Sequence, residues 1–418
     1  MALTLTEKIL AKHAGKNVVS PGEIVEVEVD KVFVHDIFAA AVIHEFTKQN
    51  KKVWDPEKIV FIVDHELPSV SQNAGAKYQE MAQFAKEQSI DNFYYGEGIC
   101  HQIMPEQGHV KPGDIIIGTD SHTVTYGALN AFSTGIGSKE MSNIWATGKI
   151  WLKVPKTIKF ILDGELQKGV YSKDLILYIL GMMKADGCVY NAIEFAGDTI
   201  NSLSMDARFT MTNMVVEMGA KNGIMPFDTA TKTFLDERNI MGYQIVENDP
   251  DADYSQVHHV DVSTIHPQMA TDKSIDDVID VHSKEGMPIH QGFIGSCTNG
   301  RIEDLRIAAA ILNGKKVAPY IKFIVTPASR SIFKQAMGEG LINTFLDAGA
   351  VVTGSGCGLC YGAHGGVVGE NEVAICANNR NFPGRLGHKN AKIFLASPAT
   401  VAASVIEGKI TSPEKYFS

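Results

Sequence analysis

Short apolar runs that stop abruptly at polar residues recur along the chain. Residues 59–63, Ile-Val-Phe-Ile-Val, lead into Asp64 and His65, and residues 115–118 lead into Thr-Asp-Ser-His. Residues 293–295 precede Ser-Cys-Thr-Asn, after which a helical apolar pattern extends to about residue 312. Continuous apolar runs with helical segments between them indicate buried parallel strands of an α/β fold. Ligands of such folds collect beyond the carboxyl ends of the strands, so these polar residues are candidates for chemistry.

The remaining pattern suggests three α/β domains, at residues 1–153, 154–285 and 286–418. A capping box at Thr4 and Glu7 predicts a helix at the N-terminus. A more alternating strand at 158–162 and a helix from about Lys173 begin the second domain, and a polar, acidic stretch from 247 to 285 predicts a surface connection. The third domain has candidate strands at 323–325, 373–376 and 393–396, and the sequence shows no internal repeat.

Composition narrows the class of protein without identifying it. The chain has 418 residues, 44% hydrophobic and 21% charged, which is typical of a folded protein with several domains. Its net charge of −10 and the lack of a basic run argue against nucleic acid as a partner. No apolar stretch suits a membrane span, and no signal peptide is evident. Six cysteines in a chain of this length favour a reducing, cytoplasmic location.

Three of the cysteines form a candidate metal site. Cys357 and Cys360 make a Cys-x-x-Cys pair among glycines, and Cys297 lies 60 residues earlier. The pair alone leaves a zinc site, a redox pair and no metal at all open as alternatives. Three thiolates would suit a [4Fe–4S] cluster that leaves one iron free to bind a substrate hydroxyl and carboxylate.

Several segments together resemble the aconitase-type hydro-lyases, in the same order and over almost the whole chain. The first two are Gly-Ser-Cys-Thr-Asn-Gly-Arg at 295–301 and Gly-Cys-Gly-Leu-Cys-Tyr-Gly-Ala-His at 356–364. The others lie at 64–65, 100–102, 118–123, 378–385 and 395–403. The chain departs from the pattern at Leu359, where many relatives carry proline, and its match around Glu194 is looser.

The resemblance implies a role for each matching position. Cys297, Cys357 and Cys360 would hold one [4Fe–4S] cluster, with one iron open to substrate. The catalytic acids and imidazoles would be Asp64, His65, His101, Asp120, His122 and Glu194. Substrate would be bound by Ser121, Asn379, Arg380 and Arg385, where a guanidinium suits a carboxylate.

The resemblance also implies a fold, a reaction and a partner. The fold would be a three-domain α/β core of parallel-rich sheets with the cluster at a domain interface, lacking the C-terminal swivel domain of full-length relatives. A separate small subunit would supply that domain and its serine base. The reaction would dehydrate a malate-type di- or tricarboxylate: 3-isopropylmalate is favoured because leucine synthesis is widespread, with homocitrate or homoaconitate, 2,3-dimethylmalate, and citramalate or maleate as alternatives.

Two further functional classes stay open, and several residues have simpler interpretations. The first is a cluster-free regulator that binds RNA, which the acidic net charge of the chain disfavours. The second is a zinc-stabilised structural subunit, which metal analysis would distinguish from an iron–sulfur enzyme. Cys100, Cys188 and Cys376 are expected to be buried small side chains. The pattern places a second group on solvated surfaces: Arg301, Arg306, His266 and His282.

Overall fold

The computed structural model describes residues 2–417, which divide into two compact units. Unit 1 comprises Met1–Tyr95, Ile103–Asp163 and Cys188–Val260. Unit 2 comprises Gly96–Gln102, Gly164–Gly187 and Asp261–Ser418. The domain boundaries suggested near 153 and 285 stay predictions. Among the described residues, no helix combines the length and the apolar character that a membrane span requires.

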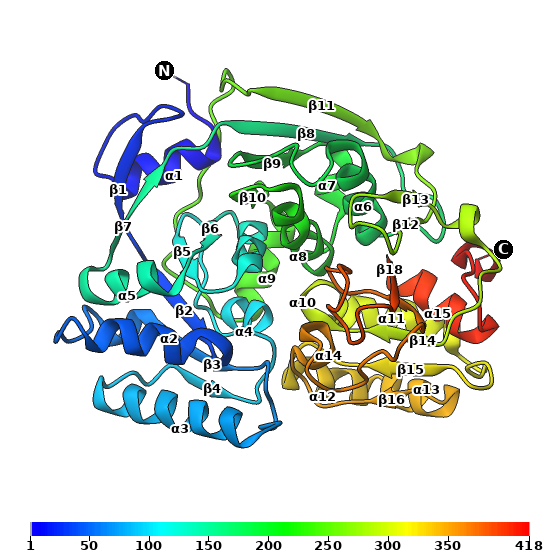
Figure 1. Ribbon diagram of the computed structural model, residues 1–418. Coiled ribbons are helices and arrows are strands. Elements are labelled where there is room, and N and C mark those ends of the chain that lie inside the picture. The colour runs from blue at the N-terminus through cyan, green and yellow to red at the C-terminus, as the bar shows by residue number, and fades with distance from the viewer. Residues whose placement is uncertain (1, 418) are drawn as a thin grey trace. The chain divides into compact units, whose positions relative to one another are not determined.

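The central sheet of unit 1 has five parallel strands in the order β4-β3-β2-β5-β6 (Figure 1). Their bounds are Lys31–His35 for β2, Ile59–Val63 for β3, Phe93–Tyr95 for β4, Ile115–Gly118 for β5 and Phe132–Gly135 for β6. The chain builds outward from β2 on one side and then returns to build β5 and β6 on the other. The topological switch point, where sheets of this kind bind ligands, therefore lies at the carboxyl ends of β2 and β5.

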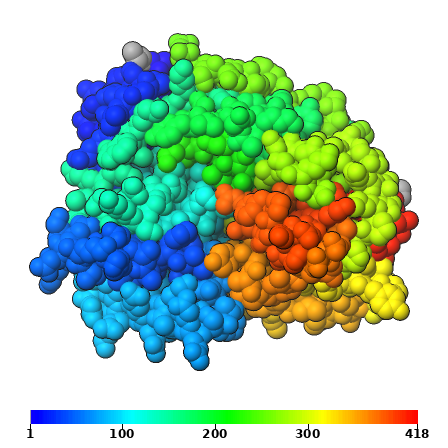
Figure 2. All heavy atoms as spheres, viewed as in Figure 1, coloured from blue at the N-terminus to red at the C-terminus, as the bar shows by residue number. Residues whose placement is uncertain are grey.

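Three helices cover this sheet with a shared aromatic core. They are α2 (Asp36–Thr47), α3 (Gln72–Glu87) and α5 (Ser138–Thr147). The buried ring of Trp145 on α5 contacts those of Phe46, Phe61 and Phe84, with centroids 5.3–5.7 Å apart. Figure 2 shows the side chains of α2 and α3, in blue and light blue, as one continuous layer. This core packs all three helices against β3, through Phe61.

The rest of unit 1 is a helix, a two-stranded sheet, a four-stranded sheet and short helices. The predicted N-terminal helix is α1 (Leu5–His13), with both capping-box bonds between Thr4 and Glu7 present. The four-stranded sheet has the order β10-β9-β8-β11. The strand bounds are Ile24–Glu28 (β1), Lys149–Lys153 (β7), Thr157–Asp163 (β8), Ala192–Ala196 (β9), Asn222–Ile224 (β10) and Gln256–Asp261 (β11). The helices are α7 (Asp198–Ser202), α8 (Met205–Asn213), α9 (Thr229–Glu237), and the 3-10 helices η1 (Pro56–Lys58), η2 (Ser121–Leu129) and η3 (Met214–Met218).

Unit 2 contains a seven-stranded sheet in the order β13-β12-β18-β17-β14-β15-β16. Its strands are β12 (Gln268–Ala270), β13 (Val278–Asp280), β14 (Gln291–Ile294), β15 (Lys322–Val325), β16 (Val351–Val352), β17 (Val373–Cys376) and β18 (Lys392–Ala396). Strands β14 to β18 are parallel, and β12 and β13 add antiparallel pairs. The parallel strands repeat the strand order of the unit 1 sheet, so their switch point lies between β14 and β17.

Helices flank this sheet, and short strands occupy part of the stretch expected to be a plain connection. The helices are α6 (Ser172–Met183), α10 (Ser296–Asn299), α11 (Ile302–Leu312), α12 (Arg330–Gly338), α13 (Leu341–Ala348), α14 (Gly358–Tyr361) and α15 (Pro398–Glu407). A further helix, α4 (Cys100–Glu106), has its first three residues in unit 2 and the rest in unit 1. The polar residues from 247 to 285 form β11, β12 and β13 as well as turns. Backbone pairing of β12 with β18 compensates there for the weak apolar pattern.

Candidate functional site

In unit 1, polar side chains gather at the carboxyl ends of three neighbouring strands. His35 ends β2 and Asp36 begins α2, while Asp64 and His65 follow β3. Asp120 follows β5 and caps η2, accepting the main-chain N–H of His122 at 2.7 Å. His35 Nε2 lies 3.7 Å from Asp120 Oδ2, directly across the switch point. The strand order therefore explains why these residues meet.

Asp36 organises the loop after β3. One carboxylate oxygen accepts the main-chain N–H groups of Asp64 and His65 at 3.3 and 3.1 Å. The other accepts the N–H of Glu66 at 2.7 Å. The same carboxylate lies 3.6 Å from His65 Nδ1, which is 2.7 Å from Asp64 Oδ1. Three main-chain contacts to one buried carboxylate fix the direction in which the His65 ring points.

The two imidazoles of this cluster have opposite electrostatics. The rings of His35 and His65 stack with centroids 4.2 Å apart. Burial opposes a charge on His65, but the negative charges of Asp64 and Asp36 raise its pKa well above the usual value. Burial and the neighbouring charge of His65 lower the pKa of His35 to about 4. The pair thus combines a protonated donor with a neutral ring, and such divergence is typical of acid–base sites.

His122 forms a second carboxylate–imidazole pair. Its Nε2 atom lies 2.7 Å from Glu217 Oε1 on η3, and its Nδ1 atom lies 3.3 Å from Asp120 Oδ1. Carboxylates therefore face both ring nitrogens and orient the ring. Ser121, the residue between Asp120 and His122, is half-buried at the start of η2.

Glu194 does not join this group. It lies in the middle of β9, where its carboxylate accepts the Tyr254 hydroxyl at 2.6 Å and the Leu5 N–H at 3.3 Å. Burial raises its pKa. These contacts tie α1 and the segment before β11 to the four-stranded sheet. The glutamate that lies beside His122 is Glu217, and the catalytic role of Glu194 stays a prediction.

In unit 2, a tight turn after β14 presents Cys297. Ser296, a non-glycine residue, has a φ of +74° and is buried. Its hydroxyl lies 2.9 Å from that of Thr298 and accepts the Thr298 N–H at 3.2 Å. Left-handed backbone at such a residue costs about 1–3 kcal/mol and is concentrated at functional sites. The turn places the Cys297 thiol at the switch point of the sheet.

Asn379, which follows the neighbouring strand β17, joins two of the cysteines. Its Nδ2 donates to Cys297 Sγ at 3.2 Å, and its Oδ1 accepts from Cys360 Sγ at 3.4 Å. Cys357 immediately precedes α14, and Cys360 lies within that helix. All three thiols are buried, and no described cysteine forms a disulfide. One amide thus joins two buried sulfur donors, and a third buried cysteine, Cys357, precedes Cys360 by three residues; this donor set suits an iron–sulfur cluster with three protein ligands.

A buried lysine supports the segment that carries Asn379. Lys173, on α6, has no exposed surface and donates to the main-chain oxygens of Ala377 and Asn378 at 3.1 and 2.7 Å. Burial lowers its pKa to about 8, against the attraction of Asp304, Cys360 and Cys297. The ammonium group thus anchors the two residues before Asn379 and brings positive charge toward the cysteine cluster.

The arginines of unit 2 differ in exposure. Arg301 was expected on a solvated face but is fully buried, because it precedes α11 and turns back into the fold. Its guanidinium donates to Thr298 O and to Gln102 Oε1, both at 3.0 Å, so it braces the Cys297 turn. Arg306 is exposed as expected and pairs with Glu339. Arg380 and Arg385 are both half-buried on the loop after Asn379.

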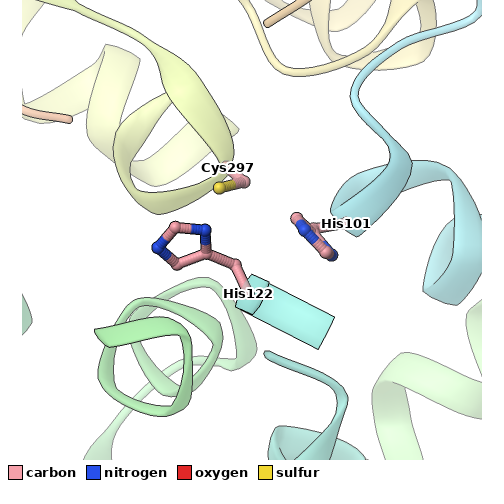
Figure 3. A group of neighbouring side chains, drawn as sticks. All are labelled: His101, His122 and Cys297. Atoms are coloured by element: carbon pink, nitrogen blue, oxygen red, sulfur yellow. The ribbon is translucent and has the colours of Figure 1, made fainter. Parts of the chain in front are cut away.

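His101 lies on α4, whose first residues belong to unit 2. Figure 3 shows its ring near the Cys297 side chain, which belongs to the same unit. A ring nitrogen of buried His101 lies within 4.8 Å of Cys297 Sγ. Cys100, Cys188 and Cys376 are buried, as expected, and burial raises the pKa of Cys188 to about 11.

The structure brings together two sets of the predicted residues and adds several that sequence reasoning missed. Unit 1 gathers Asp64, His65, Asp120 and His122, and unit 2 gathers Cys297, Cys360, Asn379 and His101. The missed residues are His35, Asp36, Lys173 and Glu217. His35 and Asp36 carried a usable signal, since they end an apolar run at Val32–Val34 just as Asp64 and His65 end theirs.

Comparison with known proteins identifies the family. A model of the aconitase family (aconitate hydratase) matches residues 7–408. The chain is 46% identical over 415 residues to a probable 3-isopropylmalate dehydratase large subunit of Methanothermobacter thermautotrophicus, with 99% of both covered. It is 46% identical over 422 residues to the 3-isopropylmalate dehydratase large subunit of Aquifex aeolicus, covering 99% of this chain and 98% of that one.

The chain is also similar to a subunit named for a different activity and to a solved structure. A probable methanogen homoaconitase large subunit of M. thermautotrophicus is 45% identical over 419 residues, covering 99% of this chain and 98% of that one. The crystal structure of holo-form aconitase X from Thermococcus kodakaraensis aligns with a TM-score of 0.51, 12% identity and coverage of 91% and 93%. That similarity is evidence of fold alone. On the family match and the full-length identities, the chain belongs to the aconitase family.

Proposed function

We propose that this chain is the large subunit of a 3-isopropylmalate dehydratase. The observation that carries the proposal is the pair of buried thiols joined by Asn379, in a chain 46% identical over nearly its full length to subunits of that name. The enzyme dehydrates and rehydrates a malate-type hydroxy acid, with a separate small subunit as its partner. A cytoplasmic location stays a prediction.

Unit 2 provides the metal-binding and carboxylate-binding groups. Cys297, Cys357 and Cys360 hold a [4Fe–4S] cluster, which when bound supplies a Lewis-acidic iron toward a substrate hydroxyl. Asn379 orients two of the sulfurs, and Lys173 keeps its segment in place. Arg380 and Arg385 bind a substrate carboxylate through their planar guanidinium groups.

Unit 1 provides the proton-transferring groups. His65, held in its charged form by Asp64 and Asp36, donates the proton that a leaving hydroxide needs. Asp36 keeps the ring aimed, and His35 stays neutral beside it. His122 and Glu217 form a second acid–base pair, and Asp120 also orients the His122 ring.

A homoaconitase is the second candidate, because the 45% identity to such a subunit is nearly as high. The test is anaerobic: the chain is reconstituted with iron and sulfide, mixed with its small subunit, and the absorbance of the unsaturated acid is followed. Turnover of 3-isopropylmalate that requires both subunits supports the proposal. Turnover of homocitrate or homoaconitate instead keeps the reaction but changes the substrate, and silence with an intact cluster rejects both.

A further inference from the structure

Two histidines and a glutamate from separate segments of unit 2 form a cluster outside the site described above. His266 precedes β12, His282 belongs to the 3-10 helix η5 (Val281–Lys284), and Glu414 belongs to the 3-10 helix η6 (Pro413–Tyr416). Their ligand-type atoms all lie within 4.8 Å of one another. Both imidazoles are about half exposed, at 48% and 47%. In Figures 1 and 2 the red C-terminal residues lie beside the yellow-green segment that carries the histidines.

The Glu414 carboxylate lies between the two rings. One oxygen is 2.6 Å from His282 Nε2, and the other is 3.4 Å from His266 Nδ1. The Ser412 hydroxyl donates to the first oxygen at 3.0 Å, which limits rotation of the carboxylate. The ring centroids are 6.3 Å apart at an interplanar angle of 72°, so the rings do not stack.

A second carboxylate orients His282. Its Nδ1 lies 3.3 Å from Glu285 Oε2, and the other Glu285 oxygen accepts the Ser412 N–H at 3.2 Å. When Nδ1–H donates to Glu285, the lone pair of Nε2 points at an oxygen of Glu414. At 2.6 Å the contact between Nε2 and this oxygen holds either a proton, which makes the ring an imidazolium, or a metal ion that displaces that proton. A carboxylate on the far nitrogen is the usual support for a metal-binding histidine.

We propose that His266, His282 and Glu414 form a surface site for a divalent transition-metal ion, with Zn²⁺ as the representative case. Two imidazoles and a carboxylate are a donor set that suits Zn²⁺ rather than Ca²⁺ or Mg²⁺. With neutral imidazoles, Glu285 and Glu414 give the cluster a charge of −2, which a divalent ion balances. Water completes the coordination, because the site is open to solvent.

The bound ion ties the end of the chain to the body of unit 2. Main-chain bonds already join Gly286 to Ile410 at 2.9 Å and Ile410 to Met287 at 2.8 Å. A metal shared by η5 and η6 adds a cross-link immediately beyond these bonds. Because binding requires the folded arrangement of three segments, the ion stabilises unit 2 and slows opening of residues 409–417.

Zn²⁺ binding to the full-length chain tests the proposal through single substitutions. Zinc per chain and its affinity are measured by calorimetry for the wild type, His282→Gln, His266→Gln and His44→Gln. His44 is the matched control, since it is exposed and 3.5 Å from a glutamate but belongs to no such cluster among the described residues. Zinc bound at the cysteines is common to all four proteins and cancels in the comparison.

We expect His282→Gln and His266→Gln each to lose one zinc ion per chain, or to bind it at least about tenfold more weakly, while His44→Gln matches the wild type. Zn²⁺ should also slow hydrogen exchange of residues 409–417 in the wild type and not in His282→Gln. Both substituted side chains are half exposed, so folding is retained and is checked by circular dichroism. Equal zinc binding by all four proteins, or an equal loss in the control, overturns the proposal.

Discussion

Replacing Asp36 by asparagine should destabilise unit 1 and disturb His65. The carboxylate accepts three main-chain N–H groups, and the shortest bond, 2.7 Å from Glu66, belongs to its own oxygen. An asparagine keeps one acceptor oxygen but presents an NH₂ group to the third donor. A hydrogen bond to a charged group is worth about 1.5–3 kcal/mol, so the expected loss in the free energy of unfolding is about 2–4 kcal/mol.

The loss should depend on pH in a defined direction. The native pKa of His65 is raised, so its charge adds stability that is fully present below the unfolded value near 6.5 and disappears as pH rises through the native pKa. The interaction with His65 keeps the pKa of Asp36 low despite burial, so its contribution is present above the unfolded value of about 4 and is lost on further acidification. The difference between wild type and Asp36→Asn should therefore be largest between about pH 4 and 6.5.

Urea unfolding at pH 6 and pH 9 measures this difference, and NMR titration of the His65 ring follows its pKa, which should fall in the variant. Asp91→Asn, at an exposed aspartate of the same unit, is the control and should change stability by less than about 0.5 kcal/mol. An Asp36→Asn protein as stable as this control, with an unchanged His65 pKa, would refute the role assigned to Asp36.

Three further substitutions test separate parts of the account. Glu217→Gln should lower kcat by about 10²–10⁴-fold with the fold intact, because Glu217 orients the His122 ring. Glu194→Gln should mainly reduce the stability of the fold, because Glu194 contacts Tyr254. The reverse pattern in steady-state kinetics and unfolding would contradict the pairing of His122 with Glu217. Lys173→Met should lower the free energy of unfolding in urea by about 1–3 kcal/mol, because two main-chain oxygens lose their donor. An unchanged or higher free energy of unfolding would show that burying the charge costs more than its contacts contribute. Burial and the charge of Asp30 raise the native pKa of Asp114 to about 7, so the stability that protonated Asp114 contributes to the fold is present at low pH and is lost between about pH 4 and 7. Asp114→Asn should therefore raise the melting temperature at pH 8 and leave it nearly unchanged at pH 4. A variant with no higher melting temperature at pH 8 would contradict this reasoning.

The strands with continuous apolar runs were predictable from sequence, whereas the strand that organises unit 1 was not. Strands β3, β5 and β17 have the predicted bounds, because each is fully buried and its run stands out. Strand β2 has only three consecutive apolar residues, Val32–Val34, and its central place follows from pairing with β3 and β5. Its importance is a property of topology, which local pattern does not encode.

The same distinction applies to the site. The cysteines and the acid–imidazole pairs at strand ends were visible in sequence, because each pair is local. Glu217 was not, since it lies 95 residues from His122 on a short 3-10 helix with no strand before it. Arg301 and Lys173 resemble ordinary helix residues in sequence, and only tertiary contacts show that both are buried beside the loops that carry Cys297 and Asn379.

Iron and acid-labile sulfide per chain test the central claim most directly. The chain is purified and reconstituted without oxygen, as the wild type and as Cys297→Ser, Cys357→Ser and Cys360→Ser, and both elements are quantified together with zinc. The account predicts about four irons and four sulfides in the wild type and loss of both in each variant. Zinc without sulfide in the wild type, or an unchanged cluster in any of the three variants, would contradict it.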